Sequence, residues 1–314
     1  DIDDLGDIGE PWGEATYILN DGLTATTYMD TTGGAMKLSL VIHRTDPEDT
    51  GSYAMPNYSS AAEVHWADNA NMISAVYIQE GVTSVGNYAF SGMTNLTEVD
   101  LPTTVTRIGD YAFQGDSRLA SPLSLSDVTE IGAYAFSGCS QLPFESLDLS
   151  GLTSLGERAF QNCSRLTGVT LPTTANFNAI PAYAFSGTGL TSIDLPENIQ
   201  EVGNYAFSGC SQLSSITLRG TEAIGDYAFY NTPVGSISLP DGLKTIGASA
   251  FERSLSAADT PLTSLTIPES VTSIGNRAFF NHKNLETVTI EGTALAADDA
   301  IGDAAFGDSI ANAH

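Results

Sequence analysis

The hydrophobic positions of this chain follow one pattern that returns every 22 to 28 residues. The clearest copy, residues 96–113, reads Leu-x-x-Val-x-Leu-Pro and then Val-x-x-Ile-Gly-x-x-Ala-Phe. The closing Phe of this pattern occurs ten times, as Phe90, Phe113, Phe136, Phe160, Phe185, Phe207, Phe229, Phe251, Phe279 and Phe306. Periods of this length indicate a stacked repeat, in which each unit buries its apolar face against its neighbours.

Each repeat predicts two short strands and a turn. The alternation in Leu-x-x-Val-x-Leu favours a strand with one buried face, which Pro102 ends because proline lacks a backbone N–H. Val105 and Ile108 predict a second strand on the far side of the coil. After a turn at Gly109, we expect Tyr111–Phe113 to form a single helical turn, because about 22 residues leave no room for a long helix. The predicted fold is a mostly-β solenoid of about ten coils with short helical turns.

Residues 1–70 lack the repeat, and we predict that they form a β-rich cap. Asn20-Asp21-Gly22 separates two apolar runs and indicates a hairpin, with positive φ available at Gly22. A further strand is expected over 37–42, followed by a polar loop over 43–52. Both tryptophans, Trp12 and Trp66, fall in this region. The cap would cover the apolar end that the first coil otherwise exposes.

Residues 71–314 are then the solenoid, with an incomplete last coil. The final copy of the pattern, 301–306, has no strand after it, which leaves an open edge. Either 295–314 folds as a makeshift cap or the protein continues, and we favour continuation.

The charge balance limits the possible partners. Asp and Glu number 38 against 11 Lys and Arg, a formal net charge of −27. Such a surface repels phosphate backbones and anionic lipids, so we predict no nucleic-acid partner. No run of eighteen apolar residues is present, and we predict no direct membrane insertion.

The side chains that carry enzyme chemistry are scattered. His43, His65, His282 and His314 show no zinc-ligand spacing, and neither a Gly-x-Ser-x-Gly elbow nor a Walker loop occurs. Residues 1–6 are faintly similar to a calcium loop, but Leu5 occupies a ligand position, and a solvated terminus is the better interpretation. We predict no enzyme, no cofactor and no metal.

The three cysteines share one place in the repeat. Cys139, Cys163 and Cys210 each follow a repeat Phe by three residues, and Met93 fills the same position in another copy. This slot is typical of an interior position, so we predict buried free thiols. A Cys139–Cys163 disulfide between neighbouring coils is the alternative.

Two surface columns could bind a ligand. The first lies on the exposed side of the first strand and is rich in short hydroxyls and acids. Its candidate ligand residues are Tyr77, Glu98, Asp100, Asp148, Thr170, Asp194 and Thr217. The alternative is that Ser and Thr are simply suitable strand residues, since the column lacks the aromatic and Arg anchors of binding hot spots.

The second column precedes Ala-Phe. It holds Tyr88, Tyr111, Tyr134, Tyr183, Tyr205 and Tyr227, with Arg158 and Arg277 among the remaining copies. The tyrosines could stack as a ladder along one edge. We favour rings that shield the next coil with their hydroxyls in water; an aromatic ladder for glycans is the alternative.

The combined pattern, Leu-x-x-Ile-x-Leu-Pro and then Val-Thr-x-Ile-Gly-x-x-Ala-Phe-x-x-Cys, resembles the BspA-like leucine-rich repeats of bacterial surface proteins. The resemblance covers about residues 71–306, and 51–58, Trp66 and 81–86 are similar to the lead-in of such repeats. It implies a right-handed leucine-rich-repeat solenoid whose first strands line the concave side. It also implies an exported protein with a role in adhesion, and no enzyme.

We therefore predict a non-enzymatic, secreted or cell-surface binding module of a bacterium. Its expected partner is a host extracellular or neighbouring-cell protein, held on the concave strand face. A passive spacer within a larger surface protein is one alternative, and a glycan-binding module is another.

Overall fold

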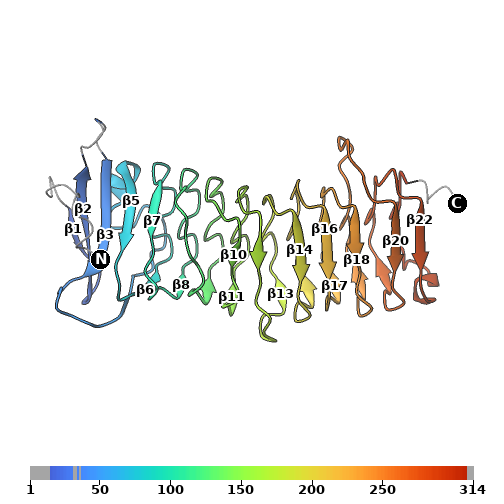
Figure 1. Ribbon diagram of the computed structural model, residues 1–314, viewed down its shortest axis with the longest axis horizontal. Coiled ribbons are helices and arrows are strands. Elements are labelled where there is room, and N and C mark those ends of the chain that lie inside the picture. The colour runs from blue at the N-terminus through green and yellow to red at the C-terminus, as the bar shows by residue number, and fades with distance from the viewer. Residues whose placement is uncertain (1–14, 31–33, 35–36, 310–314) are drawn as a thin grey trace.

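The computed structural model describes residues 15–30, 34 and 37–309, and it is an elongated stack of coils (Figure 1). The cap strands lie at one end and β22 lies at the other, with successive coils side by side between them. The ten repeat phenylalanines bound nine turns of the chain. The predicted mostly-β solenoid is confirmed.

The first strand of each coil is short and pairs in parallel with its neighbours. These strands are β5 (Ile73–Ile78), β7 (Glu98–Asp100), β10 (Leu147–Asp148), β12 (Val169–Thr170), β14 (Ser192–Leu195), β16 (Ser215–Leu218), β18 (Ser236–Ser238), β20 (Ser264–Ile267) and β22 (Thr287–Ile290). They form four separate runs along the rod: β5–β7, β10–β12, β14–β16–β18 and β20–β22. We call their solvent side the first-strand face.

The predicted second strand is also present. It comprises β6 (Val82–Val85), β8 (Arg107–Ile108), β9 (Glu130–Ile131), β11 (Ser154–Leu155), β13 (Ala179–Ile180), β15 (Glu201–Val202), β17 (Ala223–Ile224), β19 (Thr245–Ile246) and β21 (Ser273–Ile274). With β4 (Tyr53–Ala54) at the N-terminal edge, these strands form two parallel sheets. The first sheet ends at β11 and the second begins at β13. We call their solvent side the second-strand face.

The cap is built from β1 (Thr16–Ile18), β2 (Leu23–Asp30) and β3 (Lys37–Arg44), joined as antiparallel pairs. The expected hairpin is present, but Gly22 does not have a positive φ. Instead, the Asn20 Oδ1 atom accepts hydrogen bonds from the backbone N–H groups of Gly22 and Leu23. Glycine is needed there because a Cβ on Gly22 would lie 2.2 Å from the Tyr53 ring.

The cap continues into the solenoid without a break in pairing, because β3 pairs in parallel with β5. The 3-10 helix η2 (Ala67–Met72) leads directly into β5. Trp66, which precedes η2, is fully buried and stacks on Phe90 with 5.6 Å between ring centroids. Trp66 therefore closes the apolar end of the first coil. Trp12 lies outside the described residues.

The repeat phenylalanines form the central column of the core. Neighbouring rings in the column from Phe90 to Phe306 stand 5.0 to 5.7 Å apart between centroids. The rings from Phe90 to Phe279 are at most 1% exposed. Each buried ring contributes about 1.5–3 kcal/mol before entropy is counted, so this column is a major part of the folding free energy.

The turn that carries Tyr-Ala-Phe differs from the prediction of a helical turn. Its tyrosines have left-handed backbones, with φ of 60° at Tyr88 and 58° at Tyr111. The reason is that the turn bonds to the next coil: the Tyr88 N–H donates to Asp110 O (2.9 Å) and the Phe90 N–H to Ala112 O (2.8 Å). A right-handed helical turn would direct these N–H groups back along their own coil.

The two longest repeats absorb their extra residues in loops. Residues 252–261 form a loop in which the buried Arg253 donates hydrogen bonds to Asp259 O and Asn231 Oδ1. In the last coil, η3 (Ala294–Ala296) brings Leu295 into the core. Ile301 then forms a parallel bridge with Ile274, so 294–309 covers the second-strand half of the preceding coil.

We predict that Phe185→Ala lowers the free energy of unfolding by about 3–5 kcal/mol, because it opens a cavity between two stacked rings. Phe306→Ala is the matched control, since Phe306 has one ring neighbour in the column and is only partly buried. It should cost clearly less. Urea denaturation measures both, and equal losses would contradict the column as the main support of the stack.

Candidate functional site

The structure places the predicted ligand residues in register on the first-strand face. Within each paired run, Tyr77 lies beside Asp100, Asp148 beside Thr170, and Asp194 beside Thr217. Glu98 lies beside Ala75 in the neighbouring column. Tyr77 and Thr217 are half-buried and the other candidates are exposed. The candidates therefore occupy three of the runs rather than one continuous ribbon.

A groove brings two of these residues together. Thr170 and Asp194 line a hollow of about 610 Å³ with Glu197, Asn198 and Arg219. The Arg219 guanidinium donates two hydrogen bonds to the Asp194 carboxylate, both 2.8 Å long. This pairing lowers the pKa of Asp194 and keeps the carboxylate ionised. The groove thus presents a fixed, planar ion pair to solvent.

Sequence reasoning missed Arg219, although a signal was present. Arg219 directly follows β16, at the position where Pro102 and Pro196 end the equivalent strands. An arginine in place of this proline removes the strand-ending signal and adds a side chain that can bind a partner. Arg219 supplies the kind of anchor that the sequence column lacked.

Asn198 holds the far wall of this groove, which the sequence analysis also missed. Its Nδ2 group donates to the carbonyls of Pro172 (2.9 Å), Thr174 (3.1 Å) and Phe177 (2.6 Å). These bonds fix the loop that connects β12 to β13. The groove walls are therefore held by side-chain hydrogen bonds.

Another acid of this face, Asp148, is engaged locally. The Asp148 Oδ1 atom accepts the Ser150 N–H at 2.9 Å, and hydrogen bonding from Ser150 lowers the pKa of Asp148. Asp148 is exposed and ionised beside Thr170. Together, Asp148, Thr170 and Asp194 span the middle of the rod.

The tyrosine column forms the expected ladder. Ring centroids stand 4.7 Å apart for Tyr88–Tyr111 and 4.6 Å for Tyr111–Tyr134, with nearly parallel planes. The same stacking joins Tyr183, Tyr205 and Tyr227. The Arg158 guanidinium joins the two halves, since it lies over Tyr134 at 5.4 Å and over Tyr183 at 3.9 Å.

The ladder leaves little for a sugar to stack on. Tyr111 and Tyr205 each have a neighbouring ring against both faces. Burial raises the pKa of both hydroxyls, and the neighbouring tyrosines raise it further. The solvent therefore meets ring edges and neutral hydroxyls, whereas sugars bind aromatic residues through their flat faces. This geometry agrees with rings that shield the adjoining coils.

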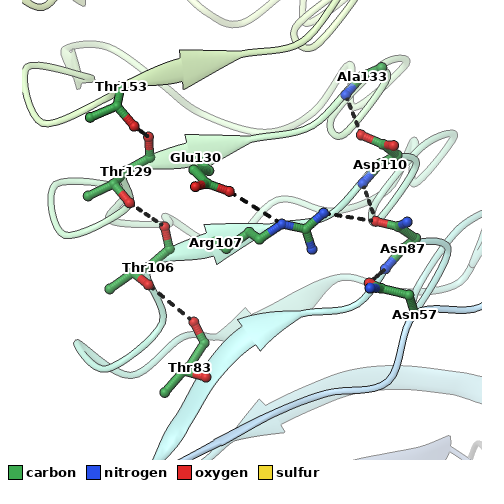
Figure 2. Close-up of polar contacts among 10 residues, drawn as sticks. All are labelled: Asn57, Thr83, Asn87, Thr106, Arg107, Asp110, Thr129, Glu130, Ala133 and Thr153. Carbon is green, nitrogen blue, oxygen red and sulfur yellow. Dashed lines mark hydrogen bonds and ion pairs between the residues drawn. The ribbon is translucent and has the colours of Figure 1, made fainter.

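A second ladder, of Asn and Asp side chains, borders the second-strand face (Figure 2). Asn87 Oδ1 accepts the Asp110 N–H at 2.9 Å, and Asp110 Oδ1 accepts the Ala133 N–H at 2.9 Å. The direction of backbone bonding between coils reverses here: Gly109 donates backward to Val85, and Tyr111 donates forward to Ala133. The Asn or Asp oxygen satisfies the N–H between them, which would otherwise lack a partner.

In several coils, the interior position three residues after the repeat Phe holds a hydrogen-bond donor. The Sγ atoms of Cys139, Cys163 and Cys210 contact the carbonyls of Phe113, Phe136 and Phe185 at 3.1 to 3.2 Å. His282 Nε2 contacts Phe251 O at 2.5 Å in the same way. All three thiols are free and buried, as predicted, and the alternative disulfide is not formed. Burial raises the pKa of Cys210 to about 11, so these thiols are not nucleophiles.

Asp116 is an exception at this position. It is fully buried, and its Oδ1 atom accepts the Met93 N–H at 2.8 Å. Its Oδ2 atom has no hydrogen-bond partner. Burial raises the pKa of Asp116 well above its ordinary value, so the neutral acid is the stable form in the fold.

Side chains that could bind a metal do not converge in the described part of the chain. No three His, Cys, Asp or Glu side chains gather there in a way that could hold a metal ion. His43 bonds to Thr26, His65 to Tyr58, and His282 to the core. His314 and the calcium-like residues 1–6 lie outside the described residues. Over the same ranges, no helix has the length and apolar character needed to cross a membrane.

This repeat architecture is shared with known proteins. The family profile described as a BspA type leucine rich repeat region matches residues 66–177, 143–258 and 256–312. A leucine-rich repeat protein from Eubacterium ventriosum is similar in structure, with a TM-score of 0.51, 21% identity, and coverage of 95% of this chain and 96% of that one. Among curated proteins, none matches the chain.

Two further solved structures are similar at lower scores. A leucine rich cell surface protein from Faecalibacterium prausnitzii is 21% identical, with a TM-score of 0.49 over 91% of this chain and 97% of that one. The pneumococcal vaccine antigen PcpA is 16% identical, with a TM-score of 0.43 over 94% and 85%.

We predict that the buried Asp116 makes the stability of the fold depend on pH. Because its folded pKa is raised, the folded state holds the proton that the unfolded state releases above about pH 4, so this residue's contribution to stability falls as pH rises. Asp116→Asn keeps an acceptor for Met93 and cannot titrate. We expect the variant to gain stability relative to the unaltered protein as the pH rises above about 4, by up to about 1.4 kcal/mol per pH unit, until the pH reaches the folded pKa of Asp116.

Urea denaturation at several pH values measures this difference, and the other titrating groups cancel in the comparison. Parallel stability curves for the two proteins would show that Asp116 is ionised in the fold.

Proposed function

Because the chain belongs to the BspA type leucine-rich repeat family, we propose that it is a non-enzymatic adhesion module, secreted or displayed on a bacterial surface. It binds a host extracellular or neighbouring-cell protein through the first-strand face. The family is one of bacterial surface proteins, whose repeats form binding modules. Repeat solenoids use extended faces of this kind because each coil adds one row of side chains at fixed spacing.

The groove at Thr170, Asp194 and Arg219 is the observation that carries the proposal. Arginine is enriched in binding hot spots, and here its guanidinium is already oriented by Asp194. An oriented side chain loses less conformational entropy when a partner binds. Asp148, one strand away from Thr170, extends the polar surface of the groove toward the N-terminus.

The alternatives predict different behaviour. A passive spacer requires only the stiff core, so the first-strand face could change freely. A glycan-binding module on the tyrosine column is less favoured, because the stacked rings cover one another's faces.

We predict that the triple variant Asp148→Lys, Thr170→Arg, Asp194→Lys loses binding to the partner by at least about tenfold, equivalent to about 1.4 kcal/mol. It reverses two charges, adds bulk to the groove and places a cation beside Arg219. Surface plasmon resonance on immobilised extracellular-matrix proteins, beside a glycan array, measures the binding. Circular dichroism and thermal melting establish that the variant is folded.

The matched control is Asp127→Lys, Ser154→Arg, Glu157→Lys. It makes the same change in net charge at exposed positions away from the first-strand face. Adhesion through the proposed face predicts binding that survives the control and not the test variant. Loss in both variants would indicate a general charge effect, and an absence of binding by the unaltered chain would favour the spacer.

A further inference from the structure

A second groove runs along the other side of the rod. It has a volume of about 840 Å³ and crosses all five strands of the sheet β13–β15–β17–β19–β21. Its floor is the column of Gly203, Gly225, Gly247 and Gly275. These glycines are required by close packing, since a Cβ at Gly247 would lie 2.6 Å from the Asp226 backbone nitrogen. Close approach of successive coils therefore requires glycine at this position along the groove.

The same face is obstructed in the N-terminal half of the solenoid. Arg107 projects from β8 across this face, within 3.5 Å of Glu130 and 3.4 Å of Asn87 Oδ1 (Figure 2). Of the five equivalent positions in the groove, only Glu201 is long, and Ala223 and Thr245 are among the four small ones. The difference between Arg107 and these two small residues opens the groove over one half of the rod.

The groove is acidic. Glu201 and Asp226 are exposed residues of its lining, and no Lys or Arg belongs to the described residues that line it. Asp226 uses Oδ1 to accept the Ala248 N–H, which fixes the orientation of its carboxylate. Asn204 and Asn276 are held in the same ladder and add amide groups along the same edge. The lining combines fixed negative charge with hydrogen-bonding groups at the repeat spacing.

We propose that this groove binds an extended, lysine-rich polypeptide segment that lies along the axis of the solenoid. Five strands at about 4.8 Å spacing give a length of about 19 Å. An extended chain rises about 3.3 Å per residue, so about six residues fill the groove. Basic side chains on one side of such a segment would complement Glu201 and Asp226, and the small residues leave room for its backbone. This site lies on a different face from the proposed adhesion surface and does not depend on it.

The test uses a fluorescent peptide of about twelve residues that alternates Lys and Thr, twice the length of the groove. A peptide with Glu in place of every Lys is the comparison. Fluorescence anisotropy at low salt should show saturable binding of the Lys peptide only, weakened by added salt. Equal binding of the Glu peptide, or no binding of the Lys peptide, would overturn the proposal.

Thr245→Arg blocks the groove and should weaken binding at least tenfold. The fold accepts Arg at this position, since Arg107 occupies the equivalent place on β8. Ser154→Arg is the matched control, because Ser154 begins β11 in the same way but lies outside the groove. It should change binding by less than about twofold. Equal effects of both variants would show that the peptide binds the acidic surface in general.

A second pair of variants isolates charge. Asp226→Asn removes one negative charge and keeps the ladder acceptor, as Asn204 does naturally, and should weaken binding about threefold. Asp110→Asn makes the same change outside the groove and should have no effect. Equal effects would overturn the placement of the site. The first-strand triple variant should bind this peptide normally, so the two proposals fail independently.

Discussion

The structure depends on the close approach of successive coils at the glycine of the Gly-x-x-Ala-Phe word. A Cβ on Gly109 or Gly132 would lie 2.6 Å from the backbone nitrogen of the preceding coil, closer than real Cβ atoms come. This approach lets backbone groups bond from coil to coil through the turn. Because it fixes the spacing at that edge, the Phe and Tyr columns stack at nearly constant distances. The left-handed tyrosine backbones, which are unfavourable for a bulky residue, persist because those bonds hold them.

The same regular spacing explains residues that first suggest chemistry. Carbonyls of the repeat Phe residues lie in the core, and those of Phe113 and Phe185 accept the backbone N–H groups of Asp116 and Thr188 with room for a second contact. The thiols of Cys139 and Cys210 and the ring of His282 contact such carbonyls. Their placement is therefore explained by packing and hydrogen bonding, without any reaction. Asp116 follows the same rule imperfectly, since one of its oxygens has no partner.

The sequence was sufficient to predict those features of the fold that repeat along the chain. Phe185 and Ile108 could be assigned to the core because burial imposes a period on the sequence. The conformation of Tyr111 could not, because its left-handed backbone depends on a bond to a carbonyl in the next coil. The Asp194–Arg219 pair joins residues 25 positions apart, and neither residue is periodic. Such contacts depend on two coils being in register, which only the structure supplies.

The distinction between repeated and exceptional positions bears on function. A side chain that recurs in every coil is needed to keep the coils at one spacing, so its chemistry is committed to the stack. The tyrosines illustrate this, because stacking occupies the ring faces that a ligand would use. Under the proposed function, we therefore expect binding to depend on departures from the repeat. Arg219 stands where Pro102, Pro196 and other prolines follow the equivalent strands. This departure lies in the groove of the proposed adhesion surface, so we expect the irregular coils, rather than the regular ones, to determine partner specificity.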